Sequence, residues 1–136
     1  MQSRTIARGV FVAAVITGMP IAAALDAPRD NKGYTTTKTT FVDLGPEIEG
    51  MAGRQLRLRV LRIEPGGHIG LHSHKDRPSV VYFLQGTDTV IRDDGSSQTF
   101  HAGDVTGEPS STVHWHRNDG QDAVILVTAD IFKTGK

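Results

Sequence analysis

The chain has 136 residues and no cysteine, and its 15 lysines and arginines balance its 15 aspartates and glutamates. This length suits a single domain. Without cysteine there are no disulfides, thiolate metal ligands or thiol nucleophiles. Proteins that bind nucleic acid through charge need a net basic surface, so the balanced charge argues against a nucleic-acid partner.

Residues 1–24 have the features of an export signal. Arg4 and Arg8 precede an apolar stretch of about 15 residues, which is the usual length of a signal-peptide core and shorter than the roughly 20 residues of a membrane span. Ala22 and Ala24 favour cleavage after Ala24. We therefore expect a periplasmic or secreted protein that leaves the membrane once the signal is removed. An uncleaved anchor or a chance apolar tail is the alternative.

The rest of the chain predicts an all-β domain. Residues 25–40 form a polar lead-in, and its threonine-rich end favours an edge strand. Residues 41–136 then alternate short apolar stretches with turns rich in Gly, Pro, Asp and Asn. No stretch repeats apolar residues at helical spacing over three turns. Strands about ten residues apart predict an antiparallel barrel or sandwich for residues 41–136.

Two of the expected strands differ in their faces. In residues 54–63, Leu56 and Leu58 alternate with Arg57 and Arg59. Alternating arginines are typical of a solvated sheet face, which we expect here; contact with an anionic substrate is the alternative. The strand at residues 79–86 is apolar on both faces, so both need to be covered. One face lines the barrel, and either the N-terminal strands or another chain must cover the other; we predict a homodimer on this basis.

Two histidine pairs lie forty residues apart, His72 with His74 and His114 with His116. Residues two apart in a strand point to the same face, so each pair can present two imidazoles together. A single pair of this kind is more often structural than metal-binding. The two pairs therefore have to be interpreted together with the residues around them.

Together, these stretches resemble the two motifs of the cupin superfamily. The first motif (Gly, five residues, His-x-His, three or four residues, Glu, six residues, Gly) matches at Gly66, His72, His74 and Gly86. The second motif (Gly, five residues, Pro, one residue, Gly, two residues, His, three residues, Asn) matches at Gly103, Pro109, His114 and Asn118, with Ser111 at its inner glycine. The resemblance implies an antiparallel jelly-roll barrel, also called a double-stranded β-helix, with a metal ion inside it. It implies His72, His74 and His114 as metal ligands.

The sequence departs from the first motif at Ser79, which stands where the family has a ligating glutamate. A hydroxyl is a weaker ligand for a divalent ion than a carboxylate. Three neutral imidazoles leave the ion its full positive charge, which favours a small anionic or chelating molecule as ligand. Some cupins with three histidine ligands resemble non-haem iron dioxygenases, and we expect this activity first. A non-catalytic metal or small-molecule binding barrel and a cupin isomerase or lyase are the alternatives.

The expected cofactor is a divalent metal ion. Fe²⁺ and Zn²⁺ are favoured, and Ni²⁺, Mn²⁺ and Cu²⁺ are compatible with imidazole ligands. His116 is the candidate catalytic residue, as a proton-transfer group beside the metal. A fourth metal ligand, or a histidine bonded to backbone, is the alternative for His116.

Two acidic residues are candidates to replace the missing carboxylate. Asp76 precedes Pro78 in an expected turn, where it is poorly placed to reach the metal. Glu108 precedes Pro109, and we expect it in a solvated loop at the barrel mouth. Ser79 itself is expected as a small inward side chain that makes room for a ligand or water.

The remaining candidates have structural interpretations. His68 and His101 are expected at the rim of the barrel or in structural roles. Trp115 lies between His114 and His116 and therefore points to the opposite side. We expect it on the outer surface, in contact with a partner subunit.

Overall fold

Residues 26–135 are described by a computed structural model, and this part of the chain contains eight strands and no helix. The strands are β1 (Lys32–Asp43), β2 (Arg54–Ser73), β3 (Ser79–Gln85), β4 (Thr87–Arg92), β5 (Ser97–His101), β6 (Val105–Glu108), β7 (Val113–Arg117) and β8 (Val124–Lys133). Accordingly, these residues include no helix long and apolar enough to span a membrane. The expected signal, residues 1–24, lies outside the described residues.

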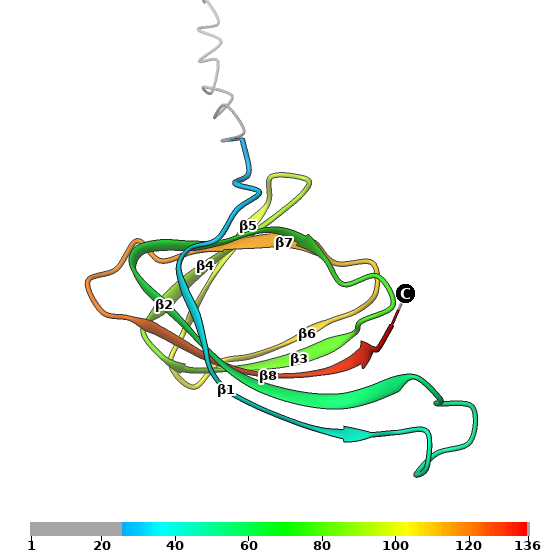
Figure 1. The fold of residues 1–136 in the computed structure, drawn as a ribbon. Coiled ribbons are helices and arrows are strands. Elements are labelled where there is room, and N and C mark those ends of the chain that lie inside the picture. The colour runs from blue at the N-terminus through cyan, green and yellow to red at the C-terminus, as the bar shows by residue number, and fades with distance from the viewer. Residues whose placement is uncertain (1–25, 136) are drawn as a thin grey trace, which may run out of the picture.

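The strands form one antiparallel sheet that curls into a nearly closed barrel. Their order is β5-β4-β7-β2-β8-β3-β6, and β1 is added beside β2. Seen into the barrel, β4, β5 and β7 form one wall and β3, β6 and β8 the opposite wall, with β2 passing from one to the other (Figure 1). The expectation of an all-β antiparallel barrel of jelly-roll type is confirmed.

β2 is the strand that joins the two walls. Its first part pairs with β8 as far as Ile63, and its second part pairs with β7 from His68 onward. Between these parts the strand bends without ending. Gly66 has a φ of 73°, and a Cβ on Gly67 would lie 2.7 Å from the Lys32 carbonyl oxygen, so both positions require glycine.

β1 begins at Lys32, inside the segment 25–40 that the sequence analysis assigned to a polar lead-in. It pairs with β2 alone, with Asp43 opposite Gln55. The threonine-rich edge strand expected from the sequence is therefore present. It extends the wall formed by β2, β8, β3 and β6.

The barrel interior is divided into an apolar zone and a polar zone. Eight buried residues fill the apolar zone: Leu61, Ile63, Val81, Phe83, Val90, Phe100, Val124 and Leu126. The rings of Phe83 and Phe100 stack there with centroids 4.4 Å apart. Farther along the same strands the inward positions become polar, and Arg57 and Ser79 both lie opposite Asp130. The apolar zone anchors the strands whose polar ends build the site.

The expectation for the faces of residues 54–63 was wrong. Arg57 bonds to Asp130, which is buried inside the barrel, whereas Leu56 is 46% exposed on the outer face. The rule that arginines face solvent fails because the polar end of the barrel interior accommodates them. The leucines instead lie on the outer surface of the barrel, among other exposed apolar side chains.

The expectation for Trp115 was also wrong. Its side chain does point away from the neighbouring His114 and His116, but it is only 5% exposed within the single chain. It lies opposite Ile91 across the pair of strands β7 and β4. Trp115 therefore packs within its own chain.

Candidate metal centre

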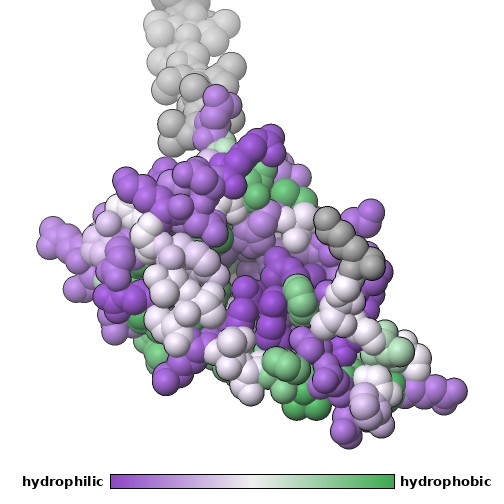
Figure 2. Space-filling view, in the orientation of Figure 1, coloured by the Kyte–Doolittle hydropathy of each residue, from purple (hydrophilic) through white to green (hydrophobic). Residues whose placement is uncertain are grey.

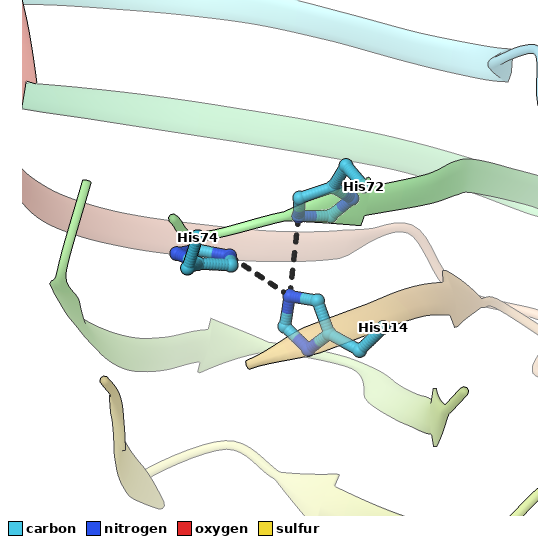
Figure 3. A group of neighbouring side chains, drawn as sticks. All are labelled: His72, His74 and His114. Atoms are coloured by element: carbon cyan, nitrogen blue, oxygen red, sulfur yellow. Dashed lines mark hydrogen bonds between the residues drawn. The ribbon is translucent and has the colours of Figure 1, made fainter. Parts of the chain in front are cut away.

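Three imidazoles meet inside the barrel. His72 lies near the end of β2, His74 follows directly after that strand, and His114 lies on β7 opposite His72. The Nε2 atom of His114 lies 3.1 Å from that of His72 and 3.0 Å from that of His74 (Figure 3). Two nitrogens bound to one ion at about 2.1 Å lie about 3.0 to 3.4 Å apart, so these residues fit a shared metal ion. The three are placed so that they can hold one.

Backbone carbonyls fix how these rings are turned. Nδ1 of His72 donates to the Gly70 carbonyl at 2.8 Å, and Nδ1 of His74 donates to the Arg77 carbonyl at 3.2 Å. A proton on Nδ1 leaves the lone pair on Nε2, which is the atom that faces the centre. His114 can donate only one proton toward two such lone pairs. At least one Nε2 lone pair is thus left without a full hydrogen bond, as expected at a site where a cation binds.

Burial keeps these imidazoles neutral. Desolvation lowers the pKa of His72 to about 4 and that of His114 to about 2, in both cases helped by the neighbouring histidines. Desolvation also lowers the pKa of His74, although the nearby Glu108 opposes the effect. A metal ligand must be deprotonated, so the environment favours the binding state at neutral pH.

Glu108 is the functional candidate that the sequence analysis placed wrongly. It lies on β6 and is only 6% exposed, not in a solvated loop. It pairs directly across from Ser79, whose hydroxyl donates a hydrogen bond to Oε2 of Glu108. Its oxygens lie 3.3 Å from Nε2 of His74 and 3.5 Å from Nε2 of His114. A carboxylate therefore does reach the centre, from the strand next to the expected one.

The sequence named Glu108 as a candidate but gave no signal that it reaches the centre, because its position depends on strand register. The short strand β6 was not expected, and the register that sets Glu108 opposite Ser79 is a long-range property. The interpretation of Ser79 as a small inward residue holds: its Oγ lies 3.2 Å from Nδ1 of His74. The room it leaves is used by Glu108.

His116 lies beside this centre and belongs to a buried ion pair. Its Nδ1 donates to Oδ2 of Asp88 at 2.6 Å, and Asp88 is fully buried. Burial alone would lower the pKa of His116, but the charge and hydrogen bond of Asp88 raise it. Its ligating atoms also group with those of Glu108 and His114. Its partner is thus a side chain, not the backbone.

The other candidates lie apart from the centre. Asp76 occupies the turn after β2 with a φ of 58°, and its carbonyl accepts a hydrogen bond from Arg54. Nε2 of His68 lies 3.7 Å from a carboxylate oxygen of Asp30, and Nδ1 of His101 lies 3.3 Å from the Thr87 hydroxyl. None of them is part of the two groups of potential metal ligands found in the described residues.

Comparison with known proteins agrees with this architecture. The family described as "Cupin domain" matches residues 59–130, which is more than half of the chain. This chain belongs to the cupin family. The matched range runs from β2 to β8 and includes all three histidines of the centre and Glu108. No curated protein matches this cupin.

Solved structures share the fold at low sequence identity. A predicted oxalate decarboxylase from Thermotoga maritima is 18% identical, with a TM-score of 0.54 over 79% of this chain and 94% of its own. A cupin-2 domain protein from Rhodospirillum rubrum is 18% identical, with a TM-score of 0.56 over 78% of this chain and 64% of its own. Ectoine synthase from P. lautus is 14% identical, with a TM-score of 0.56 over 76% of this chain and 67% of its own. These similarities extend to the fold alone.

Proposed function

We propose that this cupin binds a divalent metal ion through His72, His74 and His114 and uses it to act on a small anionic or chelating molecule. The observation that supports this most is the convergence of three Nε2 atoms within 3.1 Å of their neighbours. Burial keeps the three imidazoles neutral and therefore ready to ligate. Histidines on the surface of a protein have no need to converge in this way or to be held neutral by burial.

Glu108 completes the proposed ligand set. Its carboxylate compensates part of the ion's charge, so the earlier inference of an ion with its full charge no longer applies. Ser79 holds one oxygen of Glu108 by a hydrogen bond, which orients the carboxylate toward His74 and His114. A bound Fe²⁺ or Zn²⁺ would supply Lewis acidity toward the oxygen atoms of a chelating ligand.

The finer form of the proposal is an Fe²⁺-dependent dioxygenase, supported by the set of three imidazoles. His116 is the proposed proton-transfer group in this reaction. Its Nδ1 is held by Asp88, so its second nitrogen is oriented by a buried partner. The carboxylate of Glu108 makes a Zn²⁺-dependent or non-oxidative reaction equally accessible to the same ligands, and the experiment below separates these forms.

The test combines turnover with oxygen uptake. Protein loaded with Fe²⁺ or with Zn²⁺ under nitrogen is mixed with a panel of small carboxylates and hydroxy acids, and consumption is followed by NMR and with an oxygen electrode. We expect metal-dependent consumption of at least one compound, accompanied by oxygen uptake with Fe²⁺, and its loss in His72→Ala. Tight metal binding without any turnover would contradict catalysis and leave a binding barrel.

We also propose that two copies pair through the outer face of the wall formed by β1, β2, β8, β3 and β6. Exposed apolar residues on this face, which we call the outer apolar face, are Val42, Leu56, Leu58, Val80, Tyr82, Leu84 and Val105. With strands about 4.8 Å apart and three outward residues per strand, five strands present roughly 500 Å² in projection, comparable with the about 800 Å² that each partner of a stable pair buries. An apolar face of this kind can be covered by the same face of a second copy of the chain, which favours a homodimer.

We further propose export, on the strength of the sequence of residues 1–24. Expression of the full chain in a bacterial host, followed by N-terminal sequencing of the periplasmic protein, tests it. We expect a chain that starts at Leu25. A full-length chain retained with the cytoplasmic fraction would contradict the proposal.

A further inference from the structure

Three arginines converge on one carboxylate next to the metal centre. Asp130, on β8, accepts hydrogen bonds from Arg57 Nε and Nη2 at 3.0 and 2.7 Å, from Arg59 Nη2 at 3.2 Å and from Arg77 Nη1 at 3.1 Å. The arginine side chains are only 18% to 21% exposed, and Asp130 is fully buried. The Cζ atom of Arg57 lies over the ring of Phe132, 3.8 Å from the ring centroid. The guanidinium groups are therefore held in place.

This cluster carries excess positive charge. Three guanidinium groups and one carboxylate leave two positive charges without a counter-charge among them. Burial, followed by the charge of Arg57, lowers the pKa of Arg59, which indicates how unfavourable the concentration of cations is. Nε of Arg59 is buried and has no hydrogen-bond partner. Natural structures rarely leave such a donor unsatisfied without a reason.

The three arginines line one cavity together with His72, one of the proposed metal ligands. A cavity of about 420 Å³ is lined by, among others, Tyr34, Arg57, Arg59, His72, Arg77 and Phe132. Figure 2, in the orientation that looks into the barrel, shows hydrophilic residues gathered in the hollow at the centre of this face. A molecule bound at His72 would therefore extend toward guanidinium groups. This volume suits a small organic molecule.

We propose that Arg57, Arg59 and Arg77 form an oxyanion-binding subsite, and that the ligand carries an oxyanion besides the group that meets the metal. This inference rests on the proposed function for the position of the metal-binding group. Guanidinium forks match the geometry of a carboxylate or a phosphate and bind either with charge-assisted hydrogen bonds. Asp130 positions the three arginines and leaves net charge for the ligand.

Calorimetric titration of the purified protein tests the subsite. The probes are succinate, acetate and inorganic phosphate, added to the wild type and to Arg59→Gln and Arg77→Gln. Arg62→Gln is the matched control, because Arg62 lies on the same strand but points outward and pairs with Glu64 at 2.6 Å. Arg77 lies in the turn between β2 and β3, so its variant is expected to fold even if Arg59→Gln does not.

We expect succinate or phosphate to bind the wild type, and the affinity to fall about tenfold or more in Arg59→Gln and Arg77→Gln, the effect of losing a charge-assisted hydrogen bond. The control should bind as the wild type does. A preference for succinate assigns a carboxylate to the ligand, and a preference for phosphate assigns a phosphate. Equal affinity in all variants, or no binding of either dianion to the wild type, would overturn the subsite.

Metal content, measured on the same samples, separates this inference from the proposed function. Arg59→Gln and Arg77→Gln should keep the metal content of the wild type while losing the anion. Arginine-dependent anion binding in a protein that takes up no metal would support the subsite and contradict the metal centre. Metal uptake without any arginine-dependent anion binding would support the metal centre and contradict the subsite.

Discussion

Ser79 and Glu108 face each other across β3 and β6, and the serine hydroxyl donates a hydrogen bond to the glutamate carboxylate. The serine stands where the cupin motif has a glutamate, and the carboxylate enters the centre from the neighbouring strand instead. Both side chains are buried. The centre thus keeps its carboxylate although the first motif lacks it.

The first prediction exchanges these two residues. Glu108→Gln removes the carboxylate, and we expect metal affinity to fall at least about 10-fold to 100-fold, the range that loss of a residue supporting a metal ligand already costs. Ser79→Glu combined with Glu108→Ser returns a carboxylate to the motif position at similar total volume, and we expect it to recover much of the loss. Competition with a fluorescent chelator measures both. Ser79→Ala is the control, with a smaller effect; unchanged affinity in Glu108→Gln would rule out the role of Glu108.

A second prediction concerns the buried pair of Asp88 and His116. Asp88→Asn removes the charge that raises the pKa of His116, and breaking a buried pair costs about 3 kcal/mol of unfolding free energy. Urea unfolding measures this loss, with the exposed Asp94→Asn as control. We expect the variant to keep its metal, because Asp88 contacts His116 and not the three proposed ligands. Loss of metal would instead make His116 a ligand.

The third prediction concerns pH and uses metal-free protein. The pKa values of His72 and His114 are lowered in the folded state, to about 4 and about 2, against about 6.5 in the unfolded chain. The unfolded chain therefore takes up protons first as the pH falls. Stability is therefore unaffected by these groups above about pH 7 and falls as the pH drops from about 6.5 toward 4, on the order of 3 kcal/mol for His72 alone, while the loss from His114 continues below pH 4.

Urea midpoints between pH 8 and 4 check this dependence. We expect His72→Gln to show a shallower decline than the wild type between pH 6.5 and 4, because glutamine does not titrate. Parallel curves for the two proteins would show that His72 titrates alike in the folded and unfolded states. That outcome would contradict its burial as a neutral group.

Part of this centre followed from the sequence and part did not. His72, His74 and His114 were identified because they lie at fixed local spacings around glycine and proline, which short motifs record. Glu108 was named as a candidate but expected in a solvated loop, because its true place depends on the register of β3 against β6. Register depends on contacts between distant segments, so one sequence without the fold gives no direct measure of it.

The arginines of β2 show a second limit. Alternation separated Arg57 and Arg59 correctly from Leu56 and Leu58, but the choice of inner face was inverted. The rule that apolar residues face inward assumes an apolar interior and a solvated exterior. Here the polar end of the barrel holds Asp130, and the outer face is apolar, so both assumptions fail on one strand.

A fourth prediction concerns the outer apolar face. Val80 is 60% exposed and lies on β3 within this face, between Ala129 of β8 and Gly107 of β6. Val80→Lys places a charge where the proposed pair would bury it, which strongly disfavours association. Sedimentation should show a dimer for the wild type and a monomer for the variant. Ile48→Lys, at an exposed loop residue, is the control and should remain dimeric; a monomeric wild type would refute the pairing.

The most direct test of the metal centre is elemental analysis of the protein purified without added chelator and dialysed against Fe²⁺ or Zn²⁺. We expect about one ion per chain in the wild type, a large loss in His72→Ala, His74→Ala and His114→Ala, and no loss in His101→Ala, whose imidazole lies outside the centre. A wild type without bound metal, or histidine variants that retain as much metal as the wild type, would contradict the account.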